Sequence, residues 1–206
     1  MAELPLTQFV TLDGVCQGPG GPKEDTRGGF VHGGWSHPYA DDDFGAFITG
    51  VFDRAGAFLL GRRTYEIFAG AWPRVTDEDD PIASRLNNLR KYVVSTTLDR
   101  ADWHNSTIVS GGVAEEVARL KRETDGELQM HGSGTLARSL MAGGLVDEFH
   151  LLVFPVVLGS GLRLFADGTP PTRFEPAASS VTGSGVAIHT YRTAGLPEYG
   201  AFELAE

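Results

Sequence analysis

The segment Gly61-Arg62-Arg63-Thr64 carries residue types that bind phosphate. It follows the apolar run AFLLG and opens a helical pattern, RRTYEIFAG. Glycine lets a ligand approach the backbone closely, the first N–H groups of a helix are free to donate, and arginine adds positive charge. We therefore interpret residues 61–64 as a phosphate cradle. The alternative is an ordinary helix cap with two solvated arginines.

Two further turns follow strand patterns and carry similar groups. Ser95 and Thr96 end the run KYVVST, where their hydroxyls could bind a phosphate or could simply form a turn. The segment Gly132-Ser133-Gly134-Thr135-Leu136 follows ELQMH and opens a helical pattern, so its backbone amides could hold a pyrophosphate. The alternative for this segment is a glycine turn with Ser133 or Thr135 as the helix cap.

The elements that would position these turns alternate between strand and helix. Strand patterns lie at 6–12, 57–61, 91–95, 107–110 and 127–132, and helical patterns at 41–55, 62–70, 113–123 and 135–142. This alternation predicts an α/β fold with a mainly parallel central sheet covered by helices on both faces. The carboxyl ends of parallel strands share one edge, where such folds place ligands, so we expect the three turns to lie together.

The C-terminal third departs from this alternation. Strand patterns at 148–159, 172–182 and 186–193 follow one another without helices between them, which predicts an antiparallel hairpin at one edge of the sheet. We expect a single domain over residues 1–193 and an acidic, loosely attached tail at 194–206. The glycine-rich stretch 15–37 is expected to be a long surface loop that serves a site.

Composition excludes several classes of partner and site. The net charge of −10 leaves no basic stripe for a nucleic acid or an anionic membrane, so any bound phosphate must be held locally. An export signal and a membrane-spanning run are both missing from the sequence, and we expect a cytoplasmic protein. Cys16 is the only cysteine and no histidine pair has helical metal-ligand spacing, so we expect no metal.

Five motifs in order carry a family resemblance. They are TLDG (11–14), GRRTYE (61–66), VVST (93–96), HGSGTLARSL (131–140) and LVDEFHLLVFPVVLGSGLRLF (145–165). The chain resembles the dihydrofolate reductase superfamily over nearly its whole length. The resemblance is greater to the C-terminal reductase domain of bacterial riboflavin-pathway deaminase-reductases and its stand-alone relatives. It implies the three-layer fold of that superfamily.

The resemblance also implies NADPH as the cofactor. Arg62 and Thr96 look like ligands of the 2′-phosphate, and the backbone of Val10 and Thr11 would lie beside the nicotinamide. Arg63, Thr64 and the amides of 133–136 would serve the pyrophosphate. The full set of cofactor-binding residues implied is Val10, Thr11, Gly61, Arg62, Arg63, Thr64, Ser95, Thr96, Gly132, Ser133, Gly134, Thr135 and Leu136.

The substrate side departs from the dihydrofolate reductases. The segment Trp35-Ser36-His37-Pro38 is similar to the family's W-x-x-P element, but Ala40 stands where the proton-donating carboxylate is expected. Asp41 is the nearest catalytic candidate, and capping the following helix is its alternative role. Asp13 and Trp35 are candidate substrate-binding residues. Asp13 could instead form a common Asp-Gly turn, and Trp35 could instead pack in the core.

Together these features predict an NADPH-dependent reductase that transfers hydride to a planar pterin- or pyrimidine-like heterocycle. One alternative is the pyrimidine reductase of riboflavin biosynthesis, although the chain has no deaminase motif. The other is a non-catalytic NADPH-binding protein. The apolar segment 153–161 and the family resemblance both predict a homodimer.

Overall fold

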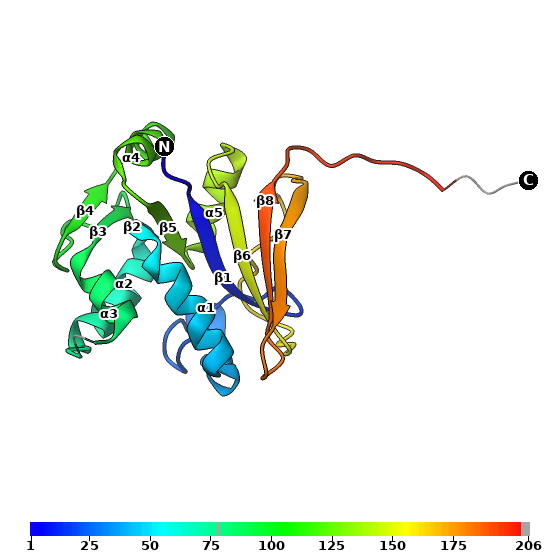
Figure 1. The fold of residues 1–206 in the computed structure, drawn as a ribbon, viewed down its shortest axis with the longest axis horizontal. Coiled ribbons are helices and arrows are strands. Elements are labelled where there is room, and N and C mark those ends of the chain that lie inside the picture. The colour runs from blue at the N-terminus through cyan, green and yellow to red at the C-terminus, as the bar shows by residue number, and fades with distance from the viewer. Residues whose placement is uncertain (78, 203–206) are drawn as a thin grey trace, which may run out of the picture.

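The computed structural model describes residues 1–77 and 79–202, which form an eight-stranded sheet in the order β4-β3-β2-β5-β1-β6-β8-β7 (Figure 1). The strands are β1 (Pro5–Thr11), β2 (Ala55–Gly61), β3 (Arg90–Val94), β4 (Ser106–Val109), β5 (Glu127–His131), β6 (Glu148–Phe154), β7 (Phe174–Val181) and β8 (Ala187–Thr193). The helices are α1 (Asp42–Asp53), α2 (Arg62–Ala71), α3 (Pro81–Asn88), α4 (Val113–Glu123) and α5 (Gly134–Ala142). Short 3₁₀ turns lie at Arg27–Gly29, His37–Tyr39 and Trp72–Arg74.

The pairing of the strands confirms the predicted sheet. Strands β1 to β6 pair in parallel, and β8 runs antiparallel to both β6 and β7. The C-terminal hairpin therefore closes one edge of the sheet, as the run of strand patterns without helices predicts.

Two apolar cores lie on opposite faces of the sheet. In β2, Phe58 and Leu60 point into the core shared with α1, α2 and α3, while Ala57 and Leu59 point into the core shared with α4 and α5. All four side chains are almost completely buried. This alternation follows from the two-residue period of a strand and explains why AFLLG reads as an unbroken apolar run. Figure 1 shows α1 in front of the sheet and α5 behind it.

Helix α3 is an element that the sequence patterns missed. Its N-cap Asp80 accepts hydrogen bonds from Ile82 N at 2.9 Å and Ala83 N at 2.8 Å, and Pro81 takes the first helical position. An Asp-Pro pair of this kind is a recognised helix start, so the signal was present. The predicted strand 148–159 also ends early, at Phe154, because Pro155 cannot donate to a sheet ladder.

The sheet opens between its two central strands. β1 pairs with β5 only at Leu6↔Met130 and Thr7↔His131, whereas its pairing with β6 continues to Thr11↔Phe154. Beyond Thr7 the chain of β5 therefore turns away into α5 and leaves one side of β1 without a strand neighbour. This divergence places an opening at the carboxyl edge of the sheet.

The C-terminal segment leaves the body of the protein after β8. Residues 194–202 run away from the sheet, and Leu196, Tyr199 and Phe202 are highly exposed (Figure 1). The last four residues of the predicted acidic tail, 203–206, lie outside the described residues. In residues 1–77 and 79–202, no helix is long and apolar enough to cross a membrane.

Candidate active site

A cavity of about 690 Å³ lies where β1 and β5 diverge. Its walls come from the carboxyl ends of β1, β2, β3 and β5, from α1, α2 and α5, and from the loop 15–37. A cavity of this size can hold a small-molecule ligand or part of a dinucleotide. The loop 15–37 lines this cavity, as expected for a loop that serves a site.

Two of the predicted phosphate-binding turns are locked together in this cavity. Ser133 Oγ accepts a hydrogen bond from Gly61 N at 2.9 Å, and Thr64 Oγ1 accepts one from Ser133 N at 3.0 Å. Gly132 and Ser133 both adopt left-handed backbone conformations, with φ of 58° and 56°. A Cβ on Gly132 would lie 3.3 Å from Thr64 Oγ1, so glycine permits this close approach.

The cavity is locally positive although the chain is acidic overall. Two carboxylates, Glu24 and Asp25, line it beside five arginines, which are Arg27, Arg62, Arg63, Arg138 and Arg163. A chain of net charge −10 would repel an anion without such a local excess of cations. This cluster of arginines is the electrostatic basis for an anionic ligand.

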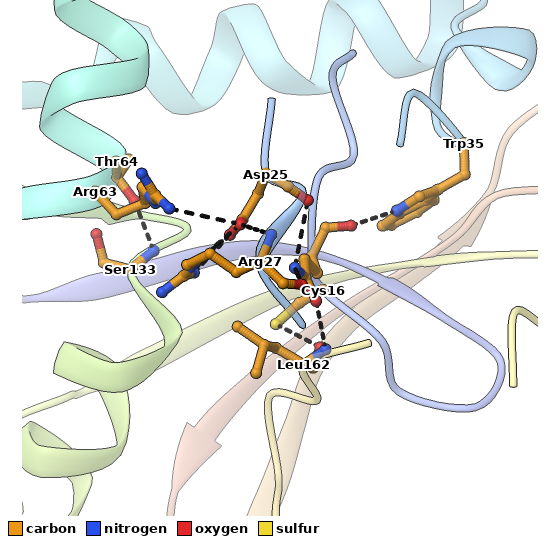
Figure 2. A network of polar contacts seen from close by, with 9 residues as sticks. Cys16, Asp25, Arg27, Trp35, Arg63, Thr64, Ser133 and Leu162 are labelled. Atoms are coloured by element: carbon orange, nitrogen blue, oxygen red, sulfur yellow. Dashed lines mark hydrogen bonds and ion pairs between the residues drawn. The ribbon is translucent and has the colours of Figure 1, made fainter. Parts of the chain in front are cut away.

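Arg63 and Arg27 share one carboxylate of the loop. Figure 2 shows Asp25 between them, with its carboxylate 3.8 Å from Arg63 and 2.5 Å from Arg27. The hydrogen bond from Arg27 lowers the pKa of Asp25, so this carboxylate is ionised at neutral pH. The ion pairs tether the loop to the start of α2 and hold both guanidinium groups beside the cavity.

Arg62 connects the cradle to the turn after β3. Its guanidinium donates to Glu66 Oε1 at 2.7 Å, to Thr97 Oγ1 at 2.6 Å and to Thr97 O at 3.1 Å. Ser95 and Thr96 do not line the cavity. Ser95 Oγ instead accepts hydrogen bonds from Thr97 N and Leu98 N, and Thr96 is exposed at the surface.

The other half of the cavity is apolar and aromatic. Its wall consists of Phe9, Phe44, Ile48, Phe52, Phe68, Trp72 and Ile82. Helix α1 faces the cavity with three apolar side chains of this wall, because residues spaced by four share one helix face. Flat apolar rings can stack against such a surface.

Asp41 stands outside the cavity, at the start of α1. Its carboxylate accepts hydrogen bonds from Phe44 N at 2.8 Å and from Ser184 N at 2.6 Å. The bond from Phe44 N is the main cause of a lowered pKa at Asp41. Asp41 therefore serves as the N-cap that the sequence offered as the alternative to catalysis.

Asp13 and Thr11 hold a turn instead of lining the cavity. Thr11 Oγ1 donates to Asp13 Oδ1 at 2.6 Å, and Asp13 accepts from Leu158 N at 3.2 Å and Gly159 N at 2.9 Å. The cavity-lining residues of β1 are Thr7, Gln8 and Phe9, which precede the predicted Val10 and Thr11. The shift follows from the divergence of β1 and β5 directly after Thr7.

Trp35 packs in the core and holds the loop 15–37 through a hydrogen bond. Its indole N–H donates to Gln17 O at 2.8 Å (Figure 2), and its ring packs edge-on against Phe154 at 5.2 Å. Trp35 is 7 % exposed and is not among the described residues that line the cavity. Its position matches the packing alternative given for this residue.

The surroundings of Cys16 do not activate its thiol as a nucleophile. The thiol donates to Leu162 O at 3.4 Å, and burial raises the pKa of Cys16 to about 11. It is therefore protonated at neutral pH and acts as a small packing side chain.

Polar groups buried along β1 escaped the sequence patterns. Thr7 Oγ1 lies 3.0 Å from His150 Nδ1, and Gln8 Oε1 is buried without a hydrogen-bond partner. His131 stacks on Phe52 with ring centroids 4.5 Å apart, and burial lowers the pKa of His131 to about 3, with a smaller contribution from His150. His131 is therefore neutral in the folded protein near neutral pH.

Arg27, Arg138 and Arg163 are cavity residues that were not among the predicted site residues, although Arg138 and Arg163 lie within the motifs 131–140 and 145–165. They lie on the loop, on α5 and after β6, and only the fold brings them to one cavity. Arg138 donates to Arg163 O at 3.1 Å, and Arg163 donates to Asp13 O at 2.8 Å. Within residues 1–77 and 79–202, no group of three or more His, Cys, Asp and Glu side chains is arranged to hold a metal ion.

Comparison with protein families identifies the relationship. Residues 3–188 match the model of the RibD C-terminal domain. The chain belongs to the RibD C-terminal domain family. The chain is also similar to the uncharacterized protein YyaP from Bacillus subtilis (strain 168), with 28% identity over 188 residues that cover 90% of this chain and 92% of YyaP.

Three solved structures share the fold of this chain. A putative riboflavin biosynthesis protein from Shewanella sp. PV-4 superimposes with a TM-score of 0.70 at 21% identity, covering 94% of this chain and 99% of that one. The deaminase/5-amino-6-(5-phosphoribosylamino)uracil reductase from Thermotoga maritima gives 0.60 at 12% identity, covering 94% of this chain and 57% of that one. Dihydrofolate reductase from Enterococcus faecalis gives 0.55 at 16% identity, covering 93% and 94%. The predicted dihydrofolate reductase-like fold is confirmed.

Proposed function

We propose that this RibD C-terminal domain protein is an NADPH-dependent reductase of a planar, pyrimidine- or pterin-like heterocycle. The observation that carries the proposal is one cavity with an arginine-rich end and an aromatic end. An anionic dinucleotide suits the first, and a flat ring suits the second. The reductases named among the structural neighbours add support for this class of reaction.

The residues of the cradle fit the cofactor. Arg62 would hold the 2′-phosphate, and Arg63, Thr64 and the amides at the start of α5 would hold the pyrophosphate. Gly132 has a left-handed backbone, and a Cβ there would lie 3.3 Å from Thr64 Oγ1, so glycine suits the packed turn of the cradle. When bound, NADPH supplies a hydride equivalent, and the protein supplies binding, orientation and exclusion of water.

The aromatic wall supports an uncharged flat ring as the hydride acceptor. The α1 side of the cavity presents Phe44, Ile48 and Phe52, and the nearby His131 is neutral. Ala40 stands where the resemblance to dihydrofolate reductases places the carboxylate that protonates the pterin, and the described α1 residues that line the cavity are all uncharged. We therefore expect dihydrofolate to be reduced poorly or not at all.

Reduction of a riboflavin-pathway pyrimidine is the second candidate. Its substrate carries a ribose phosphate and needs a cation beyond those that hold the cofactor. From the sequence alone, no additional basic cluster is evident, but Arg138 and Arg163 reach the cavity from separate elements. These two arginines favour a phosphorylated substrate.

The test combines binding and turnover in the full chain. NADPH binding is measured by nucleotide fluorescence, and NADPH oxidation by stopped flow with 5-amino-6-(5-phosphoribosylamino)uracil and with dihydrofolate as probes. We expect micromolar or tighter NADPH binding and oxidation with the phosphoribosyl pyrimidine. Tight binding without oxidation by either probe would support the non-catalytic alternative, and absence of binding would refute the proposal altogether.

A further inference from the structure

A buried polar chain leads from the cavity wall across β6. Thr7 Oγ1 contacts His150 Nδ1 at 3.0 Å, and His150 Nε2 contacts Glu148 Oε1 at 2.8 Å. Thr7 and His150 are 4 % and 2 % exposed, and Thr7 lines the cavity. At its outer end, Glu148 accepts a hydrogen bond from Arg192 of β8 at 3.2 Å.

The hydrogen bond between His150 and Glu148 determines which atom donates in the hydrogen bond between Thr7 and His150. An ionised carboxylate can only accept, so the bond to Glu148 places a proton on His150 Nε2. In the neutral ring, Nδ1 is then the acceptor, and the Thr7 hydroxyl donates to it. When the ring gains a second proton, Nδ1–H donates to Thr7 Oγ1. The Thr7 hydroxyl keeps its own proton and can then donate it in a hydrogen bond toward the cavity.

We propose that the Thr7 hydroxyl is the proton donor of the reduction, with His150 and Glu148 as positioning residues that resupply its proton. The inference rests on the proposed function. As hydride is added to a carbon of the acceptor's C=N or conjugated C=C bond, the Thr7 proton passes to the other atom of the unsaturated system. Thr7 Oγ then takes the proton of His150 Nδ1. Solvent returns that proton to the neutral imidazole after product release, and the two electrons come from NADPH.

Other titratable side chains at the cavity must be compared with Thr7 as sources of the proton. The carboxylates among the described cavity-lining residues, Glu24 and Asp25, both lie on the loop. Asp25 is bound by Arg27, while Glu24 accepts from Gly20 N and has a pKa raised by burial. Glu24 is therefore the rival proton source that the experiment must separate from Thr7. His131 faces the cavity, but burial keeps it neutral.

The surroundings of His150 decide how its protonation depends on pH. Glu148 lies on the same strand, Thr7 faces it from β1, and His131 acts on it electrostatically from β5. Helix α1 contributes the uncharged ring of Phe47, with centroids 5.8 Å apart. From β8 come the register partner Thr190 and, through Glu148, the charge of Arg192. Among these groups, Glu148 is the carboxylate in direct contact with the ring, 2.8 Å from Nε2.

The arrangement is tested first without any ligand. Nitrogen-15 NMR of the histidine rings reports the tautomer of His150 and the pH at which it gains its second proton. We expect the Nε2–H tautomer in the neutral ring. Glu148→Gln keeps a hydrogen-bond acceptor but removes the charge, so it should move the protonation of His150 to lower pH. A neutral His150 with the proton on Nδ1 would overturn the proposal.

The role in turnover is tested by stopped-flow NADPH oxidation over a pH series with the phosphoribosyl pyrimidine and dihydrofolate probes. Thr7→Val should lower the rate of oxidation about 100-fold, a typical effect of removing a general acid, while changing NADPH affinity less than about twofold. Thr7→Ser should restore most of the rate. In wild type the rate should fall as pH rises and His150 becomes neutral, and Glu148→Gln should move this fall to lower pH.

Two control variants separate the proton relay from a merely structural role. Thr182→Val also removes a buried hydroxyl, but Thr182 lies in the β7–β8 turn, away from the cavity, so the pH profile should remain that of wild type. Glu24→Gln should likewise keep the fall in rate with pH. Near-normal oxidation by a folded Thr7→Val variant, or loss of the pH dependence in Glu24→Gln, would overturn the relay alone. A wild-type protein that oxidises NADPH with neither probe would overturn the relay and the reductase proposal together.

Discussion

Replacing Arg62 with alanine should weaken NADPH binding far more than NADH binding. The two nucleotides differ only in the 2′-phosphate, which carries nearly two negative charges at neutral pH. Arg62 is the side chain assigned to that group in the proposed complex. The substitution therefore removes one guanidinium group and measures its contribution to binding of the 2′-phosphate.

The structure sets the size of the effect. A hydrogen-bonded charge pair contributes about 1.5 to 3 kcal/mol, but Arg62 is 44% exposed and already pairs with Glu66 at 2.7 Å. Exposed ion pairs contribute about 0.2 to 1 kcal/mol, and part of that interaction is lost when the phosphate competes for the guanidinium. The net loss should be about 1 to 2 kcal/mol, which is about fivefold to thirtyfold in Kd.

The assay is a fluorescence titration of wild type, Arg62→Ala and Arg63→Ala with NADPH and NADH at one fixed salt concentration. Arg63→Ala should weaken both nucleotides, because the pyrophosphate is common to them. Glu66→Gln gives a control of opposite sign, since removing the competing carboxylate should tighten NADPH about twofold to threefold. Equal affinities of wild type for the two nucleotides, or unchanged NADPH affinity in Arg62→Ala, would refute the assignment and leave residues 61–64 as a helix cap.

Three further outcomes follow from the packing, the buried charge and the surface. Gly56→Ala should destabilise the fold by about 3 kcal/mol in urea unfolding, because its Cβ would lie 1.8 Å from Asp125 O, whereas Gly50→Ala in the open middle of α1 should not destabilise. The pKa of His131 is about 3 in the folded protein against an ordinary value of 6.5, so the free energy of unfolding should fall as pH is lowered between these values. The slope should be at most about 1.4 kcal/mol per pH unit, and His131→Gln should remove it in urea titrations at several pH values. Light scattering should give twice the chain mass, since apolar side chains after β6 and on β7 are exposed, and a mass of 22.1 kDa would contradict the dimer.

Local signals were sufficient for the fold class, and they indicated two of the turns that line the candidate cavity. AFLLG and KYVVS predict buried strands because their residues fill both faces of a parallel sheet. Gly61 and Gly132 mark the turns after β2 and β5, and Gly132 has a left-handed backbone close to Thr64. Strand order then brings those turns to one edge. The fold class and the position of these turns are therefore readable from patterns of about ten residues, and phosphate binding by the cradle stays a prediction.

The rest of the site depends on contacts between residues far apart in the chain. Arg163 lies 150 positions from Asp13, whose carbonyl it binds, and Thr7 lies 143 positions from His150. Asp13, His150 and Arg163 lie within the quoted motifs, but no local pattern indicates which distant residue each of them contacts. The shift from Val10 and Thr11 to Thr7 and Gln8 has the same origin, because the residue at which β1 leaves β5 is set by the whole sheet.

The acidic composition and the anionic ligand are reconciled by where the charges lie. Asp41 bonds the start of α1 and the β7–β8 turn, Asp13 bonds the turn after β6, and Asp147 binds Lys121, so these carboxylates serve structural contacts. Five arginines converge instead on one cavity. A nucleotide would therefore meet a locally positive surface within a protein that repels polyanions elsewhere, and at low salt a long-range repulsion should slow its association without removing its affinity. This separation of net charge from site charge explains why the value of −10 argues against nucleic acid and yet permits a dinucleotide.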